Sequence, residues 1–97
     1  MKVVYFAEAK EELDAAIKYY DGQRTNLGQE FYDEVQSALE RIKAMPSAWS
    51  LIWRDVRVCQ AHRFPYGIVY QVRGNAIAVV AVMHLHGRPG YWKTRIR

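Results

Sequence analysis

Apolar residues in the first 45 positions follow the period of a helix, after a short segment that suits a strand. Residues 2–6, KVVYF, are β-branched and aromatic. The apolar positions that follow have the i, i+3, i+4, i+7 spacing of one helix face and are Leu13, Ala16, Ile17 and Tyr20. Charged residues fill the positions between them. The pattern predicts a strand over 2–6 and an amphipathic helix over about 9–23 with an acidic outer face.

A second apolar stripe begins after the polar loop QRTN and ends at a proline. Asn26, with Gln29 three residues later, resembles a capping box at the start of a helix. The stripe consists of Leu27, Phe31, Val35, Ala38, Ile42 and Met45. Pro46 cannot continue a helix and disfavours helical geometry in the residue before it. We therefore expect a second helix that forms an antiparallel hairpin with the first.

Beyond the second helix, the apolar residues change to the period of two that is typical of strands. The segments 56–64, VRVCQAHRF, and 66–72, YGIVYQV, are predicted strands joined near Pro65, and 73–75 form a turn. The segment 76–84, AIAVVAVMH, is apolar on both faces, as is typical of a strand with helices on one side and partial cover on the other. The tail HGRPGYWKTRIR then leaves the sheet.

These elements give the order β-α-α-β-β-β, an antiparallel sheet with the helical hairpin packed on one face, which is the α+β class. A single domain is expected over 1–97. The one cysteine, Cys59, excludes an internal disulfide and is expected to be a small core residue. The N-terminus lacks a secretory signal, and the longest apolar run has eight residues, whereas a membrane helix needs about 20. We therefore expect a cytoplasmic protein with no membrane segment.

Charge is distributed unevenly along the chain. The net charge of +4 combines four basic and nine acidic residues in the first forty positions with ten basic residues and one acid, Asp55, after Glu40. The acids fall mainly on the predicted helices, and the basic residues fall on the sheet and tail. The charge split therefore maps onto two layers, and a concentrated basic face is typical of a protein that binds phosphates or an acidic partner.

Four segments, taken in order, resemble one family over nearly the whole chain. They are FAEAKEELDAAIKYY, the helix LGQEFYDEVQSALERI that ends near MP, RFPYGIVYQV at 63–72, and AVMHLHGRPGYWKTR at 81–95. Together they resemble the RelE/ParE family of bacterial toxins from type II toxin-antitoxin modules. The resemblance implies a compact toxin without a cofactor, and a cognate antitoxin that wraps it with an extended or helical segment.

The resemblance also implies one of two targets. RelE-like members cut messenger RNA in the ribosomal A site without a metal ion, whereas ParE-like members inhibit DNA gyrase and cut nothing. The fold alone does not choose between an enzyme and an inhibitor. The choice has to come from the residues that could carry chemistry.

Metal-independent RNA cleavage needs a base for the 2′-hydroxyl proton, an acid for the leaving 5′-oxygen and cations for the phosphorane charge. Histidine can act in either protonation state near neutral pH. The candidate catalytic residues, which apply only to an endoribonuclease, are His84, His86, Arg88 and Tyr91. The candidates for binding the target or the antitoxin are Arg57, Arg63, Arg88, Trp92, Lys93 and Arg95. His84 and His86 could share a face, but no third ligand lies nearby in the sequence, so no metal site is predicted.

The strand that would carry cleavage residues departs from the RelE-like pattern. Cleaving RelE-like toxins carry lysines, or an acid with arginine, around the second and third strands, whereas 56–64 has neither a lysine nor an acid. Gly67 precedes Ile68 at a position where RelE carries an arginine. These departures favour ParE-like inhibition of gyrase. Ribosome-dependent mRNA cleavage and a non-toxic nucleic-acid- or protein-binding relic of the fold remain the alternatives.

Several of these residues also have purely structural interpretations. Arg63 could pair with a helix carboxylate, and Tyr91 and Trp92 could either stack on single-stranded RNA or pin the tail to the core. In a strand, His62 would point to the face opposite Arg63. The residues expected to pack against the second helix are Trp49 and Trp53. The helix acids expected to form a solvated face, with no role in a site, are Glu11, Glu12, Asp14, Asp33 and Glu34.

Overall fold

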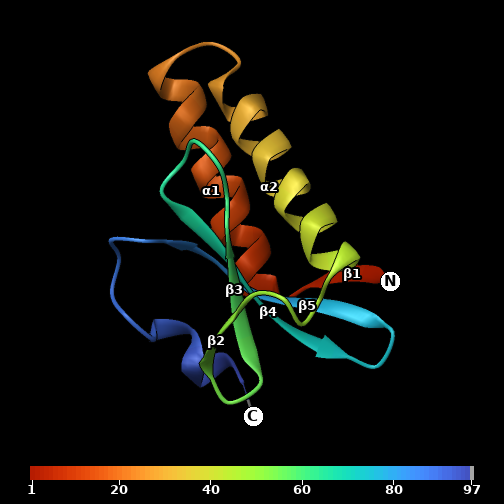
Figure 1. The fold of residues 1–97 in the computed structure, drawn as a ribbon. Helices are drawn as coiled ribbons and strands as arrows, with labels where there is room; N and C mark the ends of the chain where they lie inside the picture. Colours follow the sequence, from red (N-terminus) through yellow and green to blue (C-terminus); the bar gives the residue numbers. More distant parts are fainter. Residues whose placement is uncertain (97) are drawn as a thin grey trace.

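A hairpin of two helices lies against one face of a five-stranded sheet, and the end of the chain folds back beside the sheet (Figure 1). The computed structural model describes residues 1–96. Its elements are β1 (Lys2–Tyr5), α1 (Ala7–Gln23), α2 (Leu27–Ala44), β2 (Ser50–Trp53), β3 (Val56–Gln60), β4 (Tyr66–Arg73), β5 (Ala76–His84) and the 3₁₀ helix η1 (Tyr91–Arg95). The predicted α+β class, with the hairpin on one face of the sheet, is confirmed.

The sheet is mixed, with strand order β1-β5-β4-β3-β2. Strands β2, β3, β4 and β5 each pair with the next one in antiparallel orientation, whereas β1 runs parallel to β5. The sheet was predicted to be antiparallel, and the parallel pairing of β1 with β5 corrects that detail. The direction of β5 is set by its hairpin with β4, and β1 reaches the other side of β5 through the helices. A four-residue strand pattern carries no sign of that direction.

The segment before β3 contains a strand that the sequence pattern did not predict. In β2, Leu51 and Ile52 are both exposed, so the alternation that marks a half-buried strand is missing. The predicted strand over 56–64 ends at Gln60, and Arg63 takes a left-handed φ of 70°. The placing of His62 and Arg63 on opposite faces of a strand was therefore wrong, because neither residue lies in one.

Asp21, rather than a capping box, provides the polar contact at the start of α2. The Gly28 N–H donates to the Asp21 carboxylate at 2.8 Å. Asn26 has a φ of 69° and makes no capping hydrogen bond with its side chain, and the Gln29 amide donates to Asp33 instead. The predicted capping box was wrong, since a carboxylate at the end of α1 fills that role and joins the two helices.

The core consists of two clusters on opposite faces of the sheet. The first lies under the hairpin and includes Cys59, so the prediction of a core cysteine is confirmed. Burial raises the pKa of the Cys59 thiol. The second cluster consists of Val56, Val69, Val80, Ala81 and Trp92. The predicted partial cover on the second face of the last strand is therefore confirmed, and η1 provides it.

An irregularity in β5 changes which face of the sheet its side chains point to, so that β5 contributes residues to both clusters. Val69 pairs with Ala81 and Tyr70 pairs with Val79, which leaves Val80 as an extra residue in β5. Val80 and Ala81 both belong to the second cluster, as expected for a β-bulge. Trp49 packs on the first cluster as expected, but packing of Trp53 against the second helix was wrong, because its ring lies against Trp92 in the second cluster.

The second half of β5 forms an unpaired sheet edge, which positions the site described next. Strand β1 pairs only with residues Ala76 to Val79, and the Phe6 N–H then donates to the Val79 carbonyl as the chain turns into α1. Residues 80–84 therefore have no neighbouring strand on that side within the described chain. Among residues 1–96, no helix is both long and apolar enough to cross a membrane.

Candidate functional site

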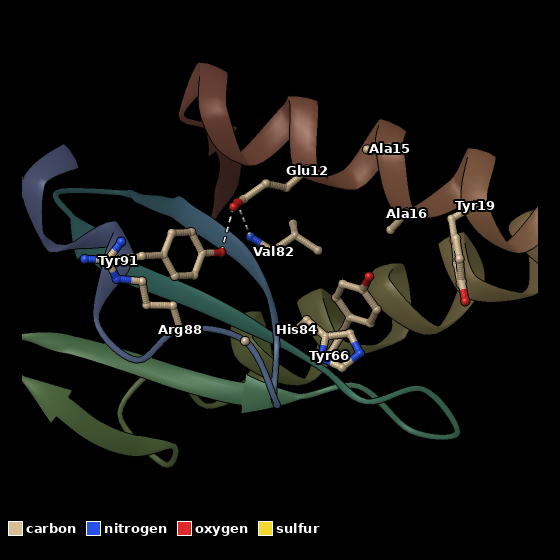
Figure 2. Close-up of a pocket in the computed structure, with 10 residues that line it drawn as sticks. Glu12, Ala15, Ala16, Tyr19, Tyr66, Val82, His84, Arg88 and Tyr91 are labelled. Carbon is tan, nitrogen blue, oxygen red and sulfur yellow. Dashed lines mark hydrogen bonds between the residues drawn. The ribbon is translucent and has the colours of Figure 1, made fainter.

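A groove runs between α1, the unpaired half of β5 and the tail (Figure 2). We call it the α1–β5 groove, and its volume is about 610 Å³. It is lined by Glu12, Ala15, Ala16, Tyr19, Tyr66, Val82, His84, Gly87, Arg88 and Tyr91. Apart from Glu12, His84 and Arg88, these residues present apolar or aromatic surface. Three candidates from the sequence, His84, Arg88 and Tyr91, thus lie around one hollow.

The Glu12 carboxylate joins α1, β5 and η1 at one end of the groove. Its Oε1 accepts hydrogen bonds from the Val82 N–H at 3.1 Å and from Arg95 Nη1 at 2.9 Å. Its Oε2 accepts from the Tyr91 hydroxyl at 2.6 Å and from Arg95 Nη2 at 3.0 Å. Figure 2 shows the bonds to Val82 and Tyr91. We call this set of four residues the Glu12 clasp.

The clasp fixes the protonation states of the two tail residues. Burial, and then the hydrogen bond to Glu12, raise the pKa of Tyr91. The hydrogen bond to Glu12 raises the pKa of Arg95 further above its already high value. Tyr91 therefore stays protonated near neutral pH, and its hydroxyl donates a hydrogen bond to the Glu12 carboxylate, which also balances the charge of Arg95.

His84 and Tyr66 line the other end of the groove, and His86, which is not part of the lining, lies next to His84. The ring centroids of His84 and Tyr66 are 5.0 Å apart, and those of His84 and His86 are 5.6 Å apart. The His86 N–H donates to His84 Nδ1 at 3.1 Å, so the proton of a neutral His84 ring lies on Nε2. Both histidines are exposed. His84 can thus present a donor to a bound group, whereas its other nitrogen is occupied.

Arg88 is the unpaired cation of the groove. It lies in the loop between β5 and η1, where its side chain is exposed and lines the hollow. No hydrogen bond or ion pair within residues 1–96 involves it. Because Arg95 is neutralised by Glu12, Arg88 carries the positive charge that the groove offers to a partner.

The remaining candidates lie elsewhere and have partners of their own. Arg57 donates to the Trp49 carbonyl at 2.7 Å, and Arg63 forms an ion pair with Glu30 at 2.7 Å. The Arg63 contact is the helix-carboxylate pairing that its structural interpretation anticipated. The Lys93 ammonium lies 5.4 Å from the centroid of the Trp53 ring, in a hollow next to the α1–β5 groove.

The tail aromatics pin η1 to the body of the protein. Trp92 is 2% exposed and packs on the second cluster, so it holds the tail in place and presents little surface to a partner. Tyr91 is held by its hydrogen bond to Glu12. Between stacking on RNA and pinning the tail, the geometry favours pinning for both residues.

Sequence reasoning missed Glu12, which was expected to belong to a solvated face. That expectation was wrong, because Glu12 lies against the sheet edge with its charge paired. Its spacing held a signal, since Glu12, Ala16 and Tyr19 follow i, i+4, i+7 along the flank of the buried stripe. Nothing in that spacing reveals that the tail returns to meet it. Within residues 1–96, no group of three or more His, Cys, Asp or Glu side chains is arranged to hold a metal ion.

Comparison with known proteins places this chain in a family. The family model described as the ParE toxin of type II toxin-antitoxin system, parDE, matches residues 3–96. The chain belongs to the ParE toxin family. The resemblance to RelE/ParE toxins is thereby confirmed, and such a ParE-family toxin has an antitoxin as its expected partner.

A solved structure supports the same fold for this ParE-family toxin. It comes from the chromosomal ParDE toxin-antitoxin system of P. aeruginosa and matches with a TM-score of 0.65 and 18% sequence identity. The match covers 89% of this chain and 97% of that chain. At this level of identity the likeness concerns the fold alone. No curated protein matches the sequence.

Proposed function

We propose that this ParE-family toxin arrests growth by binding and inhibiting DNA gyrase, and that a cognate antitoxin neutralises it. The observation that carries this proposal is the Glu12 clasp, which engages Tyr91, one of the four candidate catalytic residues, together with the cation Arg95. The Tyr91 hydroxyl donates a hydrogen bond to Glu12, and Arg95 forms an ion pair with the same carboxylate. Membership of the ParE family supports the same direction.

The groups left over are a poor set for phosphodiester cleavage. Cleavage needs a base, an acid and cations around the phosphorane. His84, His86 and Arg88 are available. However, the negative carboxylate of Glu12 lies in the same groove, and the cation close to it, Arg95, is already paired with it. A protein that acts by binding needs only a complementary surface, which the exposed cations of the tail can provide.

We propose the α1–β5 groove as the binding site of an antitoxin segment. Its apolar lining suits apolar side chains, and the unpaired Arg88 at the groove suits a carboxylate beside them. An antitoxin segment with apolar residues and an acidic side chain would therefore complement both features. Occupation of the groove would also cover the loop that carries Arg88.

A supercoiling assay on purified protein and the mapping of messages from arrested cells test the choice of target. We expect the toxin to inhibit gyrase supercoiling, and we expect no codon-phased 5′-ends in messages from arrested cells. His84→Ala should retain gyrase inhibition. Codon-phased cuts on translated messages that vanish in His84→Ala or Tyr91→Phe would instead establish ribosome-dependent mRNA cleavage.

Expression in cells tests whether the chain is a toxin at all. Strong induction of soluble, full-length protein should stop growth, and co-expression of the antitoxin should restore it. Unimpaired growth would reject the toxin proposal. Salt-sensitive RNA binding without arrest would then favour a nucleic-acid-binding relic of the fold.

A further inference from the structure

We propose that Glu12 is the positioning residue of this toxin, which fixes the tail in its working geometry and closes the free edge of β5. The clasp joins residues that are 70, 79 and 83 positions apart in the sequence. Where it concerns activity, this inference rests on the proposed gyrase inhibition. Where it concerns tail order and edge protection, it stands on the structure alone.

The Glu12 carboxylate has its acceptor capacity filled. A carboxylate offers about four acceptor sites, and Glu12 receives four donors, of which two are the arms of a single guanidinium. The side chains of Glu12 and Arg95 are 24% and 13% exposed, against 56% and 59% for the Lys10–Asp14 pair on the same helix. The clasp is therefore sheltered from the water and salt that weaken surface ion pairs.

The clasp also takes the place of a missing strand segment. Strand β1 ends opposite Val79, and beyond it the Val82 N–H is bound by Glu12 and the Val80 carbonyl by Arg95. A free sheet edge of this kind is a template for pairing with another chain. The two side chains satisfy one donor and one acceptor of that edge, so an incoming segment meets the groove as a surface for side chains rather than as an open strand.

Loss of Glu12 should loosen the tail without unfolding the protein. Trp92 remains packed on the second cluster against Trp53, and both clusters of the core are independent of Glu12. The loop from Gly87 to Gly90, which carries Arg88, is held on one side by β5 and on the other by η1. When Tyr91 and Arg95 no longer bind Glu12, η1 no longer holds its end of the loop, so the exposed cations of the tail lose their fixed positions.

Amide exchange and proteolysis test the structural part. Glu12→Ala removes the carboxylate, and Glu11→Ala is the matched control, since Glu11 is an exposed neighbour on the same helix. We expect the exchange rate of the Val82 amide and the tryptic cleavage rate after Lys93 to rise about tenfold or more in Glu12→Ala, with no change in the control. Circular dichroism should show both variants folded. Rates within twofold of the Glu11→Ala values would overturn the proposal.

Two conservative variants separate positioning from general destabilisation. Glu12→Gln keeps one oxygen for the Val82 N–H but loses the charge and one acceptor, so tail cleavage should rise while Val82 stays protected. Tyr91→Phe removes a single bond and should have a smaller effect on cleavage. Parallel changes of both readouts in Glu12→Gln would indicate mere destabilisation and reject the positioning role. These variants also keep the test decisive if Glu12→Ala fails to fold.

Supercoiling assays at equal folded concentration test the activity part. The concentration of Glu12→Gln needed for half inhibition should rise about tenfold over that of Glu11→Gln, because binding surfaces lose affinity when they must be ordered first. Unchanged inhibition with a loosened tail would overturn the link between Glu12 and activity. Failure of the wild-type protein to inhibit gyrase would instead reject the proposed function, while the exchange and proteolysis results would still decide the structural part.

Discussion

Two glycines of the helical hairpin, Gly22 and Gly28, differ in the space available for a side chain. A Cβ at Gly28 would lie 2.5 Å from the Ile17 carbonyl oxygen and 2.7 Å from the Asp21 carboxyl carbon, whereas a Cβ at Gly22 would meet nothing within 4 Å. We predict that Gly28→Ala lowers the free energy of unfolding by about 1–3 kcal/mol through overpacking. Gly22→Ala should raise it by up to about 1 kcal/mol, because alanine favours helix. Urea unfolding of both variants checks this, and equal effects would contradict it.

Tyr70 links the stability of the protein to alkaline pH. Its side chain is fully buried, and its hydroxyl donates to the Pro46 carbonyl at 2.6 Å. Burial raises the pKa of Tyr70 to about 12. An unfolded tyrosine ionises at a pH of about 10, so the folded chain keeps a proton that the unfolded chain has lost. The resulting stability is complete below about pH 10 and is lost as the pH rises toward 12.

We predict that Tyr70→Phe flattens the fall in stability between pH 10 and 12. At pH 7 the variant should lose about 1 kcal/mol, because the Pro46 carbonyl is left without its donor. Urea unfolding at pH 7, 10 and 11 measures both effects. Tyr19→Phe, at an exposed tyrosine, is the control for loss of a hydroxyl. An unchanged pH slope in Tyr70→Phe would show that another group dominates.

At the scale of elements, η1 acts as the cover of the second cluster. Trp92 supplies that cover, with its ring centroid 5.9 Å from that of Trp53 and its buried indole N–H without a hydrogen-bond partner among residues 1–96. We predict that Trp92→Ala lowers the free energy of unfolding by about 3–5 kcal/mol. Trp92→Phe should cost clearly less, since it keeps a ring and removes the unpaired donor. A loss below 1 kcal/mol in Trp92→Ala, measured by urea unfolding, would mean that η1 is not part of the core.

The helices were predictable because long amphipathic patterns are strong local signals. Both predicted helices lie within about two residues of α1 and α2, and the prediction for β5 matches its bounds. Strand β2 was not predictable, since its apolar residues are exposed rather than alternating. The parallel pairing of β1 with β5 was not predictable either, because it depends on how the helical crossover returns to the sheet.

The candidate site was predictable only in part, for a related reason. The sequence placed His84 at the end of the last strand and Arg88 and Tyr91 in the tail that follows it, and all three surround one groove. Glu12 comes from the other end of the chain and was taken for a surface acid. Its role arises from the short length of β1, which leaves part of β5 unpaired, and from the return of η1 to that edge. Both are properties of the assembled fold.

At the scale of the whole molecule, the charge split along the chain is partly cancelled inside the fold. Glu12 pairs with Arg95 and Glu30 pairs with Arg63, so acids from the helices neutralise bases from the second half. Arg88, which forms no ion pair within residues 1–96, is the cation that faces the groove.

This distribution predicts that Arg88 steers the antitoxin to the groove. Arg88→Glu should slow association by about tenfold at low salt, and the difference should shrink above about 0.5 M salt, where charges are screened within a few ångströms. Arg54→Glu in the β2–β3 turn is the matched control, because it makes the same charge change away from the groove. Stopped-flow measurements with the purified antitoxin give both rates. Equal slowing by the two variants would mean that net charge alone guides association, and a faster rate for Arg88→Glu would mean that the antitoxin presents a basic segment there.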